Sequence, residues 1–271
     1  LSAPAPRRRR PGVTLLPLVA TLAITGGLLW LRGAASEQID HVAGIIAVDG
    51  GHPPLPADAS TTRLLPAPQA PAGTDGYALL LTTSTSVAAY DPCRPLHLVV
   101  NTEAAPPTAA RILDDAIAMV APAAGLRIVV DGATDEVAAT DREPMDRGRY
   151  GNRWSPALVA WTTPERVPLL EGNTAGVGGS VAVSDRLGRL HNVSGIVHLD
   201  GPELTDVSRS RGGHALAVAI VAHELGHLLG LDHSEDEDQL MFAENSGQTR
   251  LGDGDRRGLA ALANVPCRRE F

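Results

Sequence analysis

Apolar residues fall into short runs and one helical repeat between residues 77 and 131, and their order predicts an α/β fold. Residues 77–83, 96–101 and 126–131 are short apolar runs that predict strands. Between the last two runs, apolar residues at helical spacing predict a helix over 109–124, and Gly125 is a suitable stop. A strand–helix–strand unit of this kind predicts a right-handed crossover and a mainly parallel sheet.

The second half of the chain continues this pattern. Residues 157–162 and 193–200 predict two more strands, and the Gly-rich start and later alternation of 176–184 predict an edge strand. Residues 141–154 are polar and rich in arginine, which is typical of a surface loop. A helix from about residue 213 is apolar over most of its surface, so we expect it to be buried beneath the twisted sheet.

The pattern of basic and apolar residues in the N-terminal region predicts a membrane segment. A basic block at 7–10 precedes an uncharged, mostly apolar run at 13–31, whose length of about 19 residues can span a hydrocarbon core of roughly 30 Å. The arginines before the run place residues 1–12 in the cytoplasm and the remainder outside. The alternative is a cleaved secretory signal, because Gly33 and the two alanines after it offer small residues for cleavage. In both cases the C-terminal part is exported: it faces the outside of the cell membrane, or it is secreted.

Residues 32–76 are rich in proline, alanine and glycine and predict an extended stalk. Within them the apolar stretch 42–48 predicts a strand or a small docking segment. We therefore divide the chain into a tail at 1–12, an anchor or signal at 13–31, this stalk, and a globular domain at 77–271.

Charge and cysteine content narrow the function and the compartment. The net charge of −8 and the lack of a basic patch beyond the N-terminus argue against a nucleic-acid partner. The two cysteines, Cys93 and Cys267, both follow the apolar N-terminal run. If that part lies outside the cell, a single disulfide explains both of them.

One stretch carries a candidate metal site. His223 and His227 are four residues apart on the predicted helix, so both imidazoles project from the same face and can reach one zinc ion. Gly230 can end the helix in the left-handed conformation and bring His233 round as a third ligand. Three protein ligands leave the fourth position for water, as in catalytic zinc sites. Glu224 is placed to act on that water as a general base.

These residues resemble a known family. The pattern from His223 to His233 resembles the metzincin metallopeptidase signature, and Ser234 after the third histidine resembles the matrixin branch. Met241 lies where metzincins carry a methionine turn, an apolar floor beneath the zinc ligands. Ala243 stands where astacins and serralysins have a tyrosine ligand, which argues against those branches.

The resemblance extends over about 77–267, with 252–262 similar to the final matrixin helix. It implies a metzincin-like α/β catalytic domain and a zinc-dependent endopeptidase that hydrolyses protein or peptide substrates. Glu224 would be the catalytic residue, and an extended peptide would pair with the strand at 176–184. The alternative is a degenerate module that binds zinc at a surface, or serves adhesion, without hydrolysis; the complete set of ligands and base favours the enzyme.

Two further features of the family are less well matched. His198, Asp200 and Glu203 are similar to the structural-metal segment of animal matrixins, which carry a further zinc ion and calcium ions, but the His-Gly-Asp partner motif is absent upstream. Matrixins also use a cysteine of the pro-segment to cap the zinc ion. Cys93 opens a predicted core strand and Cys267 is available to it, so we favour the disulfide over such a switch.

Overall fold

The computed structural model describes residues 43–46 and 52–268, which all belong to one compact unit from Asp40 to Phe271. The predicted anchor at 13–31 lies outside the described residues. Within the described part, no helix is both long enough and apolar enough to cross a membrane.

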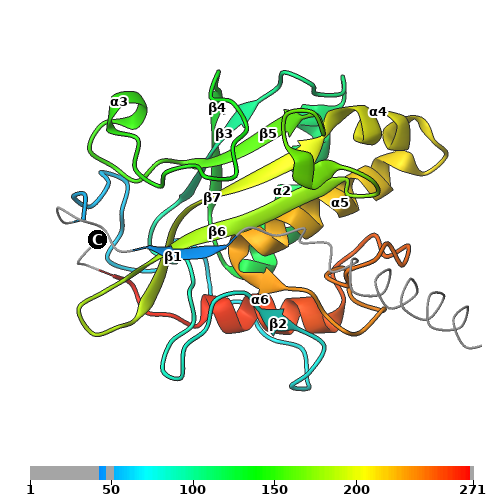
Figure 1. The fold of residues 1–271 in the computed structure, drawn as a ribbon. Coiled ribbons are helices and arrows are strands. Elements are labelled where there is room, and N and C mark those ends of the chain that lie inside the picture. Colours follow the sequence, from blue (N-terminus) through cyan, green and yellow to red (C-terminus); the bar gives the residue numbers. More distant parts are fainter. Residues whose placement is uncertain (1–42, 47–51, 269–271) are drawn as a thin grey trace, which may run out of the picture. The chain divides into compact units, whose positions relative to one another are not determined.

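A six-stranded sheet in the order β1-β6-β7-β5-β3-β4 forms the centre of the domain (Figure 1). All neighbouring strands are parallel except β6 and β7, which are antiparallel. This confirms the predicted α/β class and the mainly parallel sheet. The strands are β1 (Gly44–Ile46), β3 (Leu96–Asn101), β4 (Ile128–Ala133), β5 (Ala157–Thr162), β6 (Gly176–Ser184) and β7 (Leu190–Asp200). A small second sheet pairs β2 (Ala78–Leu79) with β8 (Leu231–Asp232).

Helices pack on one face of the sheet and form the main core with it (Figure 1). These helices are α2 (Ala109–Ala124), α4 (Gly201–Arg209), α5 (Gly213–Leu229) and α6 (Asp253–Ala263), whereas the short α3 (Arg147–Tyr150) lies on the other side of the sheet. Alternate strand residues such as Leu98, Val159 and Leu199 point to this side and pack against α2, α5 and α6. Because α5 lies between the sheet and the other helices, it is buried along most of its length, as predicted.

The other face of the sheet is covered by connecting segments. Val99, Leu158 and Val177 point to this side and pack against Val167 and Leu170, which belong to the connection after β5. The short helix α3 lies within the stretch predicted as a loop, and the 3-10 turn Pro168–Leu170 follows β5. Both faces of the sheet are therefore covered, which explains why β5 is buried throughout.

Three elements differ from the sequence prediction. Helix α4 was not predicted; Pro202 occupies its first turn, and Asp200 caps the helix by accepting from the Glu203 N–H. The strand expected at 77–83 is reduced to the two residues of β2. Strand β6 is not the outermost strand, because β1 pairs with its far end over Val181–Val183.

Residues 52–76, which we predicted to be part of a stalk, lie against the domain. The Ser60 N–H donates to the Cys93 carbonyl at 2.8 Å, and the Leu64 N–H donates to the Pro92 carbonyl at 3.0 Å. Backbone N–H groups of this segment thus bind carbonyls of the chain ahead of β3. Residues 52–76 therefore belong to the same compact unit as the residues that follow them.

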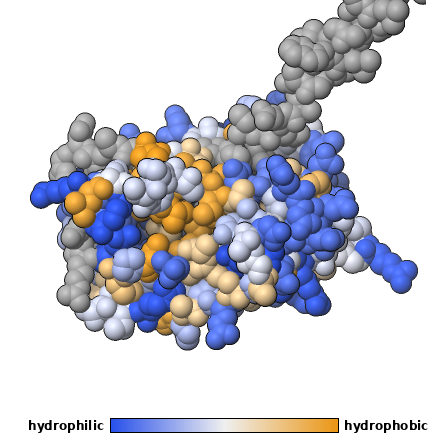
Figure 2. Space-filling model, turned by 90° about the horizontal axis from the view of Figure 1, so that it is seen from below, coloured by the Kyte–Doolittle hydropathy of each residue, from blue (hydrophilic) through white to orange (hydrophobic). Residues whose placement is uncertain are grey.

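The same segment also contacts α6. Arg257 donates to the carbonyl oxygens of Ala72 and Asp75, at 2.7 and 2.9 Å. The segment and the helix line a groove of about 350 Å³, in which five of the eleven lining residues are alanine. In the view from below (Figure 2), hydrophobic residues gather near the middle of the surface and hydrophilic residues surround them.

A histidine between two carboxylates ties residues 52–76 to the sheet. The Nδ1 atom of His97, on β3, lies 2.6 Å from Asp131 Oδ1, and its Nε2 atom lies 2.8 Å from Asp58 Oδ2. Burial favours the neutral ring, but the hydrogen bonds and charges of the two carboxylates outweigh it and raise the pKa of His97. The structure thus favours the doubly protonated ring.

This arrangement predicts a pH-dependent contribution to stability. Because the folded-state pKa is raised, the contribution is fully present below the unfolded-state pKa of about 6.5 and is lost as the pH rises through the folded-state pKa. We expect His97→Asn to lower the urea midpoint at pH 5.5 and to lower it less at pH 9. His214→Asn, which removes an exposed pair with Asp115, is the control and should have little effect at either pH. Equal losses for His97→Asn at the two pH values would contradict the assignment.

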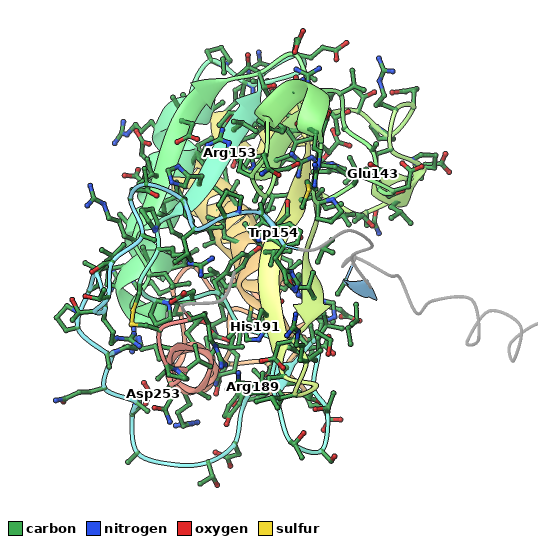
Figure 3. The ribbon with its side chains drawn as sticks, turned by 90° about the vertical axis from the view of Figure 1, so that its left-hand side faces the viewer. Glu143, Arg153, Trp154, Arg189, His191 and Asp253 are labelled. Carbon is green, nitrogen blue, oxygen red and sulfur yellow. A yellow bond between two sulfur atoms is a disulfide. The ribbon has the colours of Figure 1, made fainter. Side chains whose placement is uncertain are left out.

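The two cysteines form a disulfide, as predicted (Figure 3). The bond joins Cys93, just before β3, to Cys267, just after α6, with 5.4 Å between the Cα atoms. Cys93 is fully buried. A latency switch by Cys93 is therefore excluded in this state.

Candidate metal centre

Helix α5 carries the first two histidines of the candidate site, and its end positions the third. The helix stops at Gly230, whose φ of +115° is in the region that L side chains rarely adopt. A Cβ atom there would also lie 3.1 Å from Leu262 and 3.3 Å from the Ala88 carbonyl. The chain therefore turns sharply into β8, and His233 follows within three residues.

The three Nε2 atoms of these histidines face one another. His227 Nε2 lies 3.1 Å from His223 Nε2 and 3.2 Å from His233 Nε2, and the remaining pair is 3.3 Å apart. Two nitrogens bound to a tetrahedral zinc ion, each at about 2.0–2.1 Å, would be separated by roughly 3.3–3.4 Å. The donor set and its spacing therefore fit a tetrahedral zinc ion, and they fit it with one position left for another ligand.

Backbone carbonyls fix the orientation of two of the rings. His223 Nδ1 lies 2.8 Å from the Leu240 carbonyl, and His227 Nδ1 lies 2.9 Å from the Leu231 carbonyl. Since a carbonyl can only accept, each Nδ1 carries the proton and each Nε2 keeps its lone pair for a metal. Sequence patterns could not identify these carbonyls, because backbone acceptors have no residue signature.

Glu224 lies beside the start of β6. Its side chain is 4% exposed, and a Cβ atom on Gly176 would come within 2.5 Å of its Cγ. A Cβ atom on Gly178 would come within 2.2 Å of the Glu224 carbonyl oxygen. The glycines that we noted at the start of this strand thus allow β6 to approach the helix next to the candidate base.

Met241 lies beneath the histidines. It is 1% exposed, and its sulfur atom would lie 2.4 Å from a Cβ atom on Gly226, which sits between the two helical histidines. The Met241 carbonyl accepts from the Ser234 N–H at 2.7 Å. The turn that follows β8 therefore places the Met241 side chain against the metal-ligand helix, where it forms an apolar floor.

The residues of the possible second metal site do not come together. Within the described residues, the only other group with metal-ligand spacing contains Asp91 and the two disulfide-bonded cysteines. His198 is fully buried on β7, and burial together with the charge of Arg142 lowers its pKa to about 4. Asp200 is used as the cap of α4. The acidic residues of this segment therefore serve a helix end.

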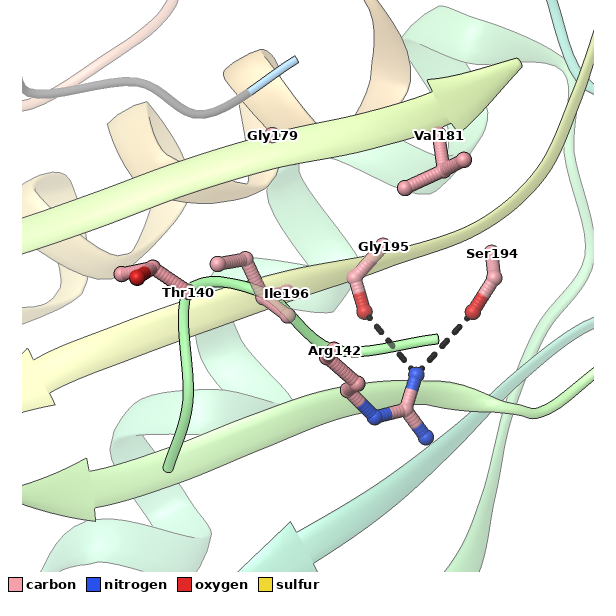
Figure 4. A pocket seen from close by; sticks show the side chains of 7 residues that line it. All are labelled: Thr140, Arg142, Gly179, Val181, Ser194, Gly195 and Ile196. Carbon is pink, nitrogen blue, oxygen red and sulfur yellow. Dashed lines mark hydrogen bonds between the residues drawn. The ribbon is translucent and has the colours of Figure 1, made fainter. Parts of the chain in front are cut away.

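The side chain of Arg142 lies against β7 (Figure 4). Arg142 donates to Ser194 Oγ at 3.0 Å and to the Gly195 carbonyl at 3.5 Å, both on β7. The same guanidinium donates to both carboxylate oxygens of Glu136, and Glu136 also accepts from Tyr150. A partly buried ion pair thus helps to hold the connection after β4 against β7.

The structure thus brings three histidines together within an α/β domain, and comparison with known proteins shows what this domain is similar to. Residues 171–263 match the family model of the matrixins, Peptidase_M10. Matrilysin from Felis catus is 38% identical over 91 residues, which are 32% of this chain and 33% of that protein. The chain thus matches about one third of the length of this curated relative. The C-terminal part of the chain, which holds β6, β7 and the metal-ligand helix, is therefore similar to the matrixins.

Two solved structures are more distantly similar. Archaemetzincin from Methanopyrus kandleri is 16% identical, with a TM-score of 0.36 over 62% of this chain and 92% of that chain. The ECX AB5 holotoxin in its GM1-bound form is 13% identical, with a TM-score of 0.36 over 70% of this chain and 90% of that chain. Neither score is high enough to establish a common fold.

Proposed function

We propose that this protein is a zinc-dependent endopeptidase that acts on proteins outside the cytoplasm. The observation that carries the proposal is the convergence of three histidine Nε2 atoms at 3.1–3.3 Å beside a buried glutamate. The match of residues 171–263 to the matrixins supports the same reaction class. We infer that His223, His227 and His233 hold the zinc ion.

The chemistry that zinc supplies in such a site is Lewis-acid activation of a bound water molecule. Glu224 would be the group that takes up a proton at its carboxylate and passes it to the amine of the leaving peptide. The close approach of β6 at Gly176 and Gly178 helps to bury the carboxylate, since Glu224 is only 4% exposed. The contacts of the Nδ1 atoms with the backbone carbonyls keep both helical histidines oriented while this proton moves.

The substrate would add to the sheet as an extended strand. Strand β1 pairs with β6 only over Val181–Val183, so among the described strands none pairs with that edge of β6 over Gly176–Ser180. Gly176 and Gly178, in the same stretch, also lie against Glu224. A peptide that pairs with this part of β6 therefore brings its backbone beside the general base.

A location outside the cytoplasm is supported by the disulfide between Cys93 and Cys267, since such bonds persist in oxidising compartments. We propose that residues 13–31 either anchor the protein in the cell membrane or act as its export signal. Detergent-free fractionation of cells that express the full chain distinguishes the two, because only an anchor keeps the metal domain with the membranes.

The decisive experiment is a cleavage assay with the purified full chain and an unfolded protein substrate. We expect cleavage to stop when a zinc chelator is added and to return when zinc is restored. Inhibitors of serine and cysteine peptidases should have no effect. A zinc-loaded, folded protein that leaves a broad set of peptides uncut would instead support the binding-module alternative.

A further inference from the structure

A buried carboxylate outside the ligand set contacts the turn beneath the metal centre. Asp255, on the first turn of α6, is 0% exposed. Its Oδ2 atom accepts from the Leu240 N–H at 2.7 Å and from the Gly252 N–H at 2.8 Å. Its Oδ1 atom accepts from the Met241 N–H at 3.2 Å. Three backbone donors therefore converge on one side chain.

The contacts of Asp255 lead directly to a metal ligand. The residue whose N–H binds Asp255 most closely, Leu240, is also the residue whose carbonyl accepts from His223 Nδ1 at 2.8 Å. The next residue, Met241, places its sulfur atom against Gly226 of the ligand helix. One carboxylate thus fixes the backbone groups that orient His223 and support the floor of the site.

The side chain of Gln239, just before Leu240, in turn binds the backbone at the start of α6. Its Oε1 atom accepts from the N–H groups of Gly254 and Asp255, at 2.8 and 3.3 Å. Its Nε2 atom donates to Asp236 at 2.8 Å. Gln239 is also buried, at 6% exposure. The methionine turn and the start of α6 therefore hold each other through side chains from both segments.

Helix capping alone does not account for Asp255. A carboxylate at this position commonly accepts from the N–H at the helix start, and the bond from Gly252 has that role. The other two bonds go to Leu240 and Met241, which are 15 and 14 residues earlier in the chain. Those donors belong to the metal centre and not to the helix.

We propose that Asp255 is a positioning residue of the metal centre, which acts on His223 through the backbone of Leu240. This proposal rests on the part of the proposed function that concerns zinc binding, and it does not require peptide hydrolysis. Removal of an outer partner of a metal-bound histidine typically weakens metal binding by about 10–100-fold. We therefore expect the zinc dissociation constant of Asp255→Asn to rise by about that factor. The asparagine amide has nearly the same shape as the carboxylate. Its NH2 group, however, is a donor and cannot accept from the backbone N–H groups.

The test uses the full chain and a matched control on the same helix. Asp253→Asn removes an exposed carboxylate that pairs with Arg256 at 3.3 Å and should leave zinc affinity unchanged. Zinc affinity is measured by competition with a chromophoric chelator, and the urea midpoint of the metal-free protein is measured separately. Asp255→Ser, which introduces no opposing amide, is made in parallel so that at least one variant at this position is available in folded form.

A second readout separates positioning from simple stabilisation. The visible absorption spectrum of the cobalt-substituted protein reports the geometry of the ligands, and we expect it to change in the Asp255 variants at metal saturation. A lower urea midpoint with unchanged zinc affinity and an unchanged cobalt spectrum would overturn the proposal. That result leaves the proposed function intact. Absence of zinc binding by the wild-type protein would overturn both, whereas zinc binding without peptide cleavage would overturn the proposed function alone.

Discussion

Glu224→Gln is expected to reduce kcat/KM for peptide hydrolysis by about 10²–10⁴-fold, the usual contribution of a general acid–base group. The amide keeps the size of the side chain in the narrow space beside Gly176, but it cannot take a proton from water. The three histidines and the carbonyls behind His223 and His227 are untouched. The variant should therefore bind one zinc ion as tightly as the wild type and unfold at the same urea concentration.

Metal analysis and the cleavage assay must be made on the same preparations. Glu244→Gln, an exposed glutamate just beyond the methionine turn, is the matched control and should retain full activity. Substantial activity in Glu224→Gln with zinc bound would remove Glu224 from the mechanism. Loss of zinc together with activity would show instead that the carboxylate is needed for the site to form.

The part of the site that the sequence predicts well is the part that depends on local spacing. His223 and His227 are brought together by one helical turn, and the φ of Gly230 lets His233 follow. A regular helix and a single positive φ are enough to specify all three positions. For the same reason α2 and α5 have the boundaries that the apolar repeat indicates.

The features that sequence patterns missed depend on contacts between distant segments. Asp255 resembles an ordinary helix-start residue until the turn at Leu240 is packed against it. Residues 52–76 have the composition of a stalk, yet their backbone donors find acceptors just ahead of β3. Helix α4 was missed for a local reason, since Pro202 disfavours a helix interior but suits a first turn.

Removal of the disulfide is expected to give the largest change in stability. In the double variant Cys93→Ala/Cys267→Ala, we expect the free energy of unfolding to fall by about 2–5 kcal/mol. The crosslink joins residues separated by 174 positions, so it restricts the unfolded chain strongly. Alanine avoids placing a hydroxyl group at Cys93, which is fully buried.

The native contacts around the bond explain why the fold itself should survive. Asp91 accepts from the Cys93 N–H at 2.9 Å and from the Arg268 N–H at 3.0 Å. These hydrogen bonds do not need the disulfide, so they can still hold the end of the chain beside residue 93. We therefore expect the double variant to remain folded and to bind zinc, with a lower urea midpoint. Asp255 lies on the first turn of α6, and Cys267 follows the last turn of that helix. We therefore expect the position of Asp255 to change little when the disulfide is removed.

Reduction of the wild-type protein is the matched experiment. A thiol reductant should lower the urea midpoint of the wild type to that of the double variant and should not affect the double variant itself. Equal midpoints for oxidised wild type and double variant would show that the bond contributes nothing. The same comparison bears on location, because cytoplasmic thiol systems keep cysteines reduced. Protein recovered from cells should unfold like the oxidised form if the domain is exported, and like the reduced form if it remains in the cytoplasm.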